Sequence, residues 1–250
     1  MAGFLSNIFG SSSKNEEQNE VEYYKKNPNP EHLTDEQLFG ISLGLIIGEL
    51  NGFYADSLDS GKNDQSQINF IKNSWGIENH NDAIYFMEAR LGDNGHRHMF
   101  NALLQIEIEQ DCVDADDIDL EGTPFEECQE EAMVLFENLD EIYEEDEYWF
   151  EEPEEDFAIG ADAWDFGRVV FIARATYSLG YISDKEAWHY IGEALRLARQ
   201  KFNNWEDYAR SYMLGRGIWG GAGDGDWMNI SNFASDALEN EQSPWIRLAW

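Results

Sequence analysis

Apolar side chains recur at intervals of three and four residues along most of the chain, which is the pattern of amphipathic α-helices. In the first half this pattern covers residues 38–58, 68–75 and 83–91. The clearest helix start is Thr34-Asp-Glu-Gln37, a capping box in which Thr and Gln satisfy free backbone N–H groups. No segment alternates convincingly between apolar and polar residues, as a strand would. The pattern predicts an all-α fold of about seven to nine helices.

The first of these predicted helices carries Gly40, Gly44 and Gly48 at a spacing of four residues, so the glycines line one side and let another backbone approach closely. In a membrane this spacing would favour helix dimerisation. A membrane span needs roughly 20 apolar residues, however, and the apolar run here is only about a dozen long. We interpret residues 38–58 as one buried core helix.

The second half continues the helical pattern. Gly180 and the capping box Ser183-Asp-Lys-Glu186 separate two long helices, which predicts an αα-hairpin. Thr123-Pro124-Phe-Glu126 predicts the start of an acidic helix with an apolar face. The helices expected in this half cover residues 96–108, 124–143, 160–179, 187–202, 204–215 and 232–238.

Charge is concentrated in one segment, because residues 107–156 hold 24 Asp or Glu residues and no Lys or Arg. The whole chain has 51 acidic and 16 basic residues and a formal net charge of −35. Binding of nucleic acid or anionic lipid through the bulk surface is therefore not expected, since Lys and Arg supply most of that affinity. Residues 141–156 contain Pro153 and are predicted to be mobile.

These observations predict a flexible N-terminal tail at residues 1–30 and a single helical domain at residues 31–250, with an acidic insert at residues 107–158. The first ten residues lack the basic start and the cleavage site of a secretion signal. Their four apolar residues leave open a weak membrane-docking turn as the alternative to a frayed tail. Cys112 and Cys128 form no CxxC pair, so a reduced, cytoplasmic protein is expected.

Five sets of short sequence blocks carry a resemblance to a known family. They are Asn73-Ser-Trp-Gly-Ile77, Gly95-His-Arg97, Ala163-Trp-Asp-Phe-Gly-Arg168, Gly180-Tyr-Ile-Ser183 with Glu186-Ala-Trp188, and Trp205-Glu-Asp-Tyr208 to Ser211-Tyr-Met-Leu-Gly-Arg216. Together, over roughly residues 35–220, they resemble the bacterial domain of unknown function 1266 family. The resemblance implies a mostly helical bacterial cytoplasmic domain and supplies no catalytic residues. The acidic insert departs from the shared blocks.

One constellation could carry small-molecule chemistry. Asp165 and Arg168 share a helix face at spacing i, i+3, and His96 and Arg97 could join them from another helix to form an anion site or an acid–base pair. The alternative is a half-buried ion pair that fixes helix packing beside Trp164.

No other motif predicts a cofactor or metal site. His96 and His98 are two residues apart, unlike the i, i+4 histidines of HExxH zinc sites. The Asp-rich segment from Asp117 begins like an EF-hand loop but has Cys128 at the twelfth position, where a bidentate Glu is needed. The six glycines of residues 215–226 predict a flexible turn rather than a phosphate-binding loop, because no Gly-Lys-Ser/Thr follows.

The acidic segment supports the main functional hypothesis, which is a non-enzymatic module that binds a basic protein. The most plausible such role is an immunity or antidote protein that captures a basic bacterial toxin domain, with aromatic anchors set among steering acids. The expected contact residues are Glu141, Tyr143, Glu144, Glu145, Asp146, Glu147, Tyr148, Trp149 and Phe150. The alternative hypothesis is an uncharacterised enzyme or small-anion-binding protein that uses the Trp-Asp-x-x-Arg helix.

Overall fold

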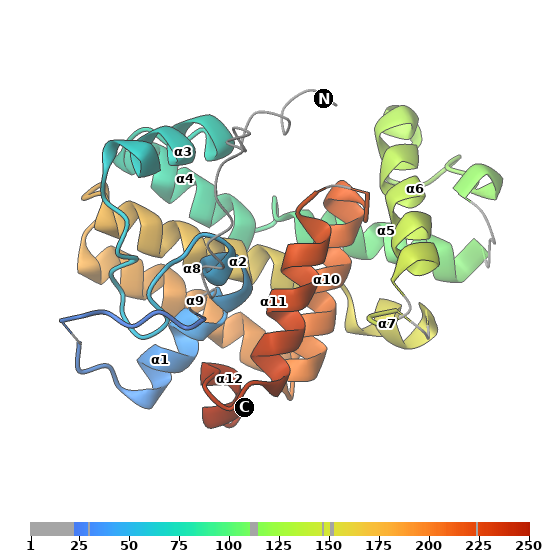
Figure 1. Cartoon of the computed structure of the whole chain (residues 1–250). Coiled ribbons are helices and arrows are strands. Elements are labelled where there is room, and N and C mark those ends of the chain that lie inside the picture. Colours follow the sequence, from blue (N-terminus) through green and yellow to red (C-terminus); the bar gives the residue numbers. More distant parts are fainter. Residues whose placement is uncertain (1–22, 30, 111–114, 147, 151–152, 224) are drawn as a thin grey trace, which may run out of the picture.

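The fold is helical, as predicted (Figure 1). A computed structural model describes residues 23–29, 31–110, 115–146, 148–150, 153–223 and 225–250, and every regular element in these ranges is a helix. The α-helices are α1 (Asp35–Ser42), α2 (Leu45–Leu50), α3 (Gln65–Trp75), α4 (His80–Leu91), α5 (His96–Gln110), α6 (Gln129–Glu145), α7 (Pro153–Ile159), α8 (Asp162–Ser178), α9 (Asp184–Lys201), α10 (Trp205–Gly220), α11 (Trp227–Glu239) and α12 (Pro244–Arg247). Two short 3₁₀ helices, η1 (Ala115–Asp117) and η2 (Glu126–Cys128), lie between α5 and α6.

Helix α8 forms the centre of the fold. Its apolar residues occupy all sides of the helix rather than one stripe, so it is buried almost throughout. Helices α4, α9 and α10 pack directly against it, and Figure 1 shows α3 and α4 above it and α10 and α11 to its right. Helices α8 and α9 form the predicted hairpin. Asp165, Arg168 and Arg174 therefore lie inside the core, where each charge needs a partner.

The helix ends largely follow the predicted caps. Both capping boxes are present, at Thr34 and at Ser183. Helix α3 ends at Gly76, which has the left-handed conformation (φ +68°) that favours glycine. Helix α4 is capped by Asn79, whose side chain accepts the backbone N–H groups of Asn81 and Asp82.

The predicted helix over residues 38–58 is wrong as a single element. It divides into α1 and α2, and residues 51–64 form turns. The Ser42 hydroxyl donates to the Leu38 carbonyl at 2.7 Å, a bond that often bends helices. Gly44 lies against α8, where an added Cβ would stand 2.9 Å from Val170 Cγ1. Tertiary packing on α8 thus accompanies the break.

The acidic segment is more ordered than its charge suggests. Helix α6 runs to Glu145 and α7 begins at Pro153, so the predicted mobility of residues 141–156 is wrong for these helical ends. The expected helix start at Pro124 is also wrong, since Thr123 Oγ1 accepts from the Phe125 N–H in a turn before η2. Helix α6 packs against α10 through its buried apolar face of Ala132, Phe136, Leu139 and Ile142.

The N-terminal region is partly anchored. Residues 1–22 and 30 lie outside the described residues, and so does any membrane-docking role of the first ten. Tyr24 is buried, its N–H donates to Glu49 Oε2 at 3.0 Å and its hydroxyl to Asp236. The predicted flexible tail therefore does not extend over residues 23–29. None of the described helices is long and apolar enough to cross a membrane.

The predicted flexible turn at residues 215–226 is wrong for its first half, because α10 continues to Gly220. Gly215 permits the close approach of α10 to α8: a Cβ there would stand 2.5 Å from Trp164 Cβ and 3.1 Å from the Ala161 carbonyl. The glycine spacing therefore reflects helix packing rather than chain flexibility.

Two glycine-to-alanine changes should act in opposite directions. Gly215→Ala is expected to destabilise the fold by roughly 1–3 kcal/mol, because the methyl group overpacks the α8–α10 contact. Gly192→Ala in the exposed middle of α9 should stabilise it by about 1 kcal/mol, since nothing lies within 4 Å of the added Cβ. Urea denaturation of both variants measures the two effects. A neutral Gly215→Ala change would contradict the packing role.

Candidate functional site

A cavity of about 390 Å³ lies over α8, where α2, α3, α4, α10 and α11 meet. Four of its lining residues are basic or can become so, namely Arg90, His96, Arg168 and Arg216. Aromatic side chains form much of the remaining wall: Phe70, Trp75, Phe86, Trp164, Tyr212 and Trp219. This concentration of arginine is notable in a chain with only 16 Lys and Arg residues. The cavity size is typical of sites for small organic molecules.

Asp165 is the charged centre beneath this cavity. It is fully buried and binds Arg168 Nη2 through Oδ1. The Arg97 N–H donates to its other oxygen at 2.8 Å, and Arg90 Nε lies 3.8 Å from Oδ1. One carboxylate is therefore shared among three arginine residues from α4, α5 and α8.

Arg97 contacts Asp165 but its side chain does not line the cavity. Its guanidinium group turns back to the C-terminal end of α4, where Nη2 donates to the carbonyls of Leu91 (2.6 Å) and Gly92 (3.1 Å) and Nη1 donates to the Arg90 carbonyl. Gly95 makes this possible, because a Cβ there would stand 2.5 Å from Arg97 Nη1. Arg97 thus caps a helix, and it is not among the residues that line the cavity.

Arg168 and Arg90 both present donor groups to the cavity. Arg168 Nε donates to the Trp164 carbonyl at 3.2 Å and Nη2 contacts Asp165, while Nη1 bonds to none of the described residues. The guanidinium of Arg90 stacks on Phe86 at 5.0 Å and hydrogen-bonds to no described residue, even though its Nε is buried. Burial lowers the pKa of both groups, that of Arg168 to about 10, so Arg168 remains cationic at neutral pH.

His96 contributes a neutral ring. Its Nδ1 lies 3.2 Å from Arg168 Nη2, and a guanidinium can only donate, so Nδ1 accepts and the proton of the neutral ring sits on Nε2. Burial, together with the nearby Arg168 and Arg90, lowers the pKa of His96 to about 4. The cavity therefore contains an imidazole N–H donor at neutral pH.

This assignment predicts an unusual titration. His96 should stay uncharged from pH 8 down to about pH 5 and gain its proton near pH 4. Because the pKa is lower in the folded than in the unfolded state, the stabilising contribution of the neutral ring is present above pH 6.5 and is lost as the pH falls from 6.5 to 4. Histidine ring resonances followed by NMR measure the midpoint. A midpoint at or above 6.5 would contradict the buried, arginine-facing environment.

Two tryptophans of the cavity have unused hydrogen-bond donors. Trp75 Nε1 and Trp164 Nε1 are both buried, and neither has an acceptor within the described part of the chain. Trp164 is only 5% exposed, so solvent reaches little of its ring. Buried polar groups without a partner are uncommon in folded proteins, but protein atoms cover both indole nitrogens, so neither is open to a ligand in the cavity.

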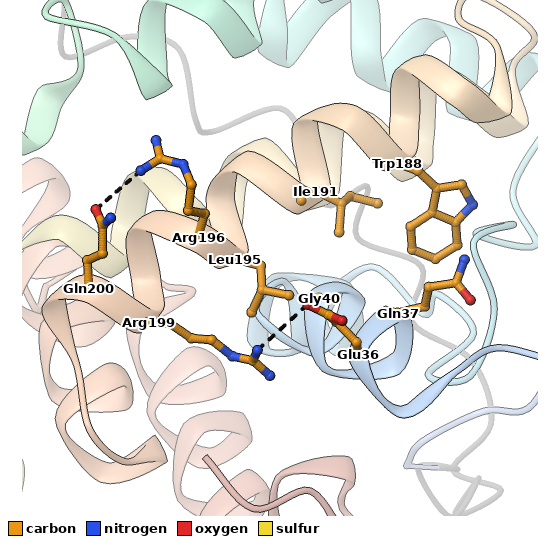
Figure 2. Close-up of a pocket in the computed structure, with 10 residues that line it drawn as sticks. Glu36, Gln37, Gly40, Trp188, Ile191, Leu195, Arg196, Arg199 and Gln200 are labelled. Carbon is orange, nitrogen blue, oxygen red and sulfur yellow. Dashed lines mark hydrogen bonds and ion pairs between the residues drawn. The ribbon is translucent and has the colours of Figure 1, made fainter.

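A second cavity of about 440 Å³ lies between α1 and α9 (Figure 2). It is larger, but its arginines are occupied and lie near the surface. Arg196 bonds to Gln200 and to Glu193, and Arg199 pairs with Glu36 at 3.7 Å. Because its cations are already paired, this groove offers a weaker anion site than the cavity over α8.

The expected protein-binding residues of the acidic segment differ in burial and in the contacts they make. Trp149 and Phe150 are buried in the core, and Trp149 Nε1 donates to Ser231 Oγ at 2.9 Å. Three others hold the fold together. These are Glu141, which accepts from the Ala222 N–H, Tyr143, whose hydroxyl donates to Asp156, and Asp146, which accepts from Trp227 Nε1. Only Glu144, Glu145 and Tyr148 are exposed, and Glu147 lies outside the described residues.

Among the described residues, no group of three or more His, Cys, Asp or Glu side chains is placed to hold a metal ion. Sequence reasoning missed Arg90, Arg216 and Trp75 as cavity residues. The scarcity of arginine in so acidic a chain was a usable signal for Arg90, which follows Phe86 by one helical turn.

Comparison with known proteins identifies a family. No curated protein and no solved structure matches the chain. The family described as "Protein of unknown function (DUF1266)" matches residues 71–250, so the match begins later than the predicted span and continues to the last residue. Helices α4, α8 and α10, and therefore most of the cavity, lie inside the matched region. Because the match covers most of the chain, this protein belongs to the DUF1266 family.

Proposed function

We propose that this protein binds a small organic anion in the cavity over α8. The observation that carries the proposal is the pair of cavity-lining arginines, Arg90 and Arg168, which retain guanidinium donors without acceptors in the described residues. A desolvated cation is unfavourable unless it is paired. A bound carboxylate or phosphate would supply the missing charge, and its oxygens match the donor geometry of guanidinium groups.

The local charge balance supports an anionic ligand. Asp165 is shared by Arg90, Arg97 and Arg168, and Asp162 adds a second carboxylate 3.8 Å from Arg97 Nε. Three guanidinium charges thus meet two carboxylates, and one of these, Asp162, also lies 3.7 Å from Lys201 Nζ. The cavity wall adds one further charge of each sign, Arg216 and Asp226. The site keeps excess positive charge inside a protein whose net charge is −35. This local positive charge attracts an anion, whereas the acidic surface around it repels anions.

The sequence blocks that resemble the family support a binding site at this cavity. Four of the blocks that carry the family resemblance contribute cavity residues: Trp75, His96, Arg168 and Arg216 come from four separate blocks. A structural Asp–Arg pair alone would explain Asp165 and Arg168, but it would not require Trp75 and Arg216 to face the same space.

A ligand screen tests this proposal. Thermal shift and isothermal titration at low ionic strength are applied with carboxylates, phosphate, sulfate and phosphate esters, each organic anion paired with its neutral amide or alcohol. At least one anion should bind with one-to-one stoichiometry and raise Tm, while its neutral counterpart does not. Binding that is equally strong for the neutral counterparts, or no binding by any anion, would overturn the proposal.

We propose as a second function that the acidic segment binds a basic protein, such as a toxin domain. The exposed side of α6 carries Glu130, Glu131, Val134, Glu137, Glu144 and Glu145 without a basic residue, and Val134 is 52% exposed. A pull-down from lysate of the source organism, eluted with salt, should yield one stoichiometric basic protein. Glu144→Gln with Glu145→Gln should then slow its association and flatten the salt dependence. Unchanged association kinetics would contradict this function.

A further inference from the structure

Tyr212 of α10 presents its hydroxyl group to the cavity over α8. The residue lines the cavity and is only 1% exposed. Its hydroxyl hydrogen-bonds to none of the described residues. Unlike the indole nitrogens of Trp75 and Trp164, this hydroxyl is not completely covered by protein atoms. The little surface that Tyr212 exposes therefore includes the hydroxyl and borders the cavity.

The other buried tyrosines in the described part of the chain have acceptors. The hydroxyl of Tyr24 donates to Asp236, that of Tyr190 to Glu88 at 3.3 Å, and that of Tyr208 to the Leu43 carbonyl at 2.8 Å. A buried hydroxyl without an acceptor is unfavourable. A ligand atom that accepts from Tyr212 would remove this cost.

Packing holds the Tyr212 hydroxyl close to Arg168. The Tyr212 ring lies against Gly167, where an added Cβ would stand 2.8 Å from Tyr212 Cε2, and it meets Trp164 edge-on at 5.1 Å. Arg168 follows Gly167 in α8. Burial raises the pKa of Tyr212 above its ordinary value, although the nearby charges of Arg216 and Arg168 oppose this, so the phenol keeps its proton at neutral pH. Tyr212 is therefore a neutral donor beside a cationic one.

The two arginines can satisfy a carboxylate without help from Tyr212. A carboxylate has two oxygens with about four acceptor sites. Arg168 Nη1 and both terminal nitrogens of Arg90 bond to none of the described residues, and each of these nitrogens carries two N–H groups. The Tyr212 hydroxyl is left for an acceptor other than the carboxylate, and because it is neutral it suits a neutral oxygen.

We infer that the ligand is a 2-oxo or 2-hydroxy carboxylate, whose carboxylate meets Arg90 and Arg168 and whose 2-oxygen accepts from the Tyr212 hydroxyl. In such an acid the two groups stand on adjacent carbons, which matches the neighbouring positions of Arg168 and Tyr212. The aromatic side chains of the cavity wall contact the apolar body of the acid. This inference rests on the proposed anion binding and narrows its ligand to one class of acids.

Three acids with the same carbon skeleton test the inference on the wild-type protein. Isothermal titration compares phenylpyruvate and phenyllactate, which have an oxo and a hydroxyl oxygen at carbon 2, with 3-phenylpropionate, which has neither. At least one of the first two should bind about five- to tenfold more tightly than 3-phenylpropionate, the effect of one additional hydrogen bond in a buried site.

Two tyrosine variants locate the contact. Tyr212→Phe removes only the hydroxyl, so it should abolish the preference for the 2-oxygen and leave the affinity for 3-phenylpropionate unchanged. Its urea midpoint should not fall, because the lost hydroxyl bonds to none of the described residues. Tyr208→Phe, one turn earlier in α10, is the matched control. It loses a hydroxyl that already has a partner, so it should lower the urea midpoint and keep the preference.

The outcomes distinguish this inference from the anion site. Equal binding of the three acids, or binding only of other anions from the ligand screen, would overturn the inference and leave the anion site standing. Equal losses for all three acids in Tyr212→Phe would mean that the hydroxyl binds the carboxylate itself. A preference that survives in Tyr212→Phe would place the 2-oxygen on another donor, such as His96 Nε2, and either result overturns the inference. If no anion binds, the proposed function falls as well.

Discussion

Replacing Arg90 by glutamine is expected to weaken anion binding by roughly 10- to 100-fold, because a hydrogen bond to a charged group contributes about 1.5–3 kcal/mol. Stability should change by less than about 1 kcal/mol. The reason is that Arg90 makes no hydrogen bond to a described residue and its nearest carboxylate, Asp165, lies 3.8 Å away. Its charge is therefore available to a ligand at little cost to the fold. Isothermal titration and urea denaturation of Arg90→Gln measure the two effects.

Arg196→Gln is the matched control, since it removes one positive charge from the α1–α9 groove, where the Arg196 side chain is half exposed. It should leave the affinity within about twofold, as expected for a screened surface charge. Equal losses in both variants would indicate a diffuse electrostatic effect. No loss in Arg90→Gln would contradict the assignment of the anion to this cavity.

Asp165→Asn should be the most destabilising of these changes, at about 3–5 kcal/mol, because removing one partner of a buried ion pair leaves the other charge without compensation. Asp165 is fully buried, accepts from the Arg97 N–H and holds Arg168. An asparagine cannot compensate the positive charges around it. Urea denaturation should show a lower midpoint with an unchanged slope.

Asp184→Asn controls for the loss of a carboxylate in the first turn of a helix. Asp184 begins α9 and is exposed, so the change should cost no more than about 1 kcal/mol through the helix dipole. A large loss at Asp165 together with a small one at Asp184 supports the positioning role of Asp165. A stable Asp165→Asn protein would contradict this structural role, and if it no longer bound anions, Asp165 would act on binding by holding Arg168 in place.

Local sequence signals predicted much of the fold. The helix type and the capping boxes at Thr34 and Ser183 follow from short-range hydrogen bonding, so they could be predicted from the sequence. The break between α1 and α2 was not, because it depends on the contact of Gly44 with Val170, more than a hundred residues away. The high charge of residues 141–156 led to a prediction of mobility. The helical structure there depends on apolar contacts with the rest of the fold, which the charge pattern does not reveal.

The candidate site was predictable in part. The spacing of Asp165 and Arg168 marked a shared helix face, and His96 does join them in space. Arg97, next in sequence to His96, points to the end of α4 instead, because successive helical residues face different directions. Trp75 and Arg90 reach the cavity only through tertiary packing. Likewise, nothing in the acidic sequence reveals that Trp149 is buried while its neighbour Tyr148 is 62% exposed.

The central claim is that the cavity over α8 binds an anion, and the indole N–H resonances of ¹⁵N-tryptophan-labelled protein test it most directly. On titration with the tightest anion of the ligand screen, the signals of Trp75 and Trp164 should shift and saturate together, because both side chains line the cavity. The signal of Trp188, in the α1–α9 groove, should remain in place. Saturable shifts of Trp188 alone, or no shift of Trp75 and Trp164, would contradict the account.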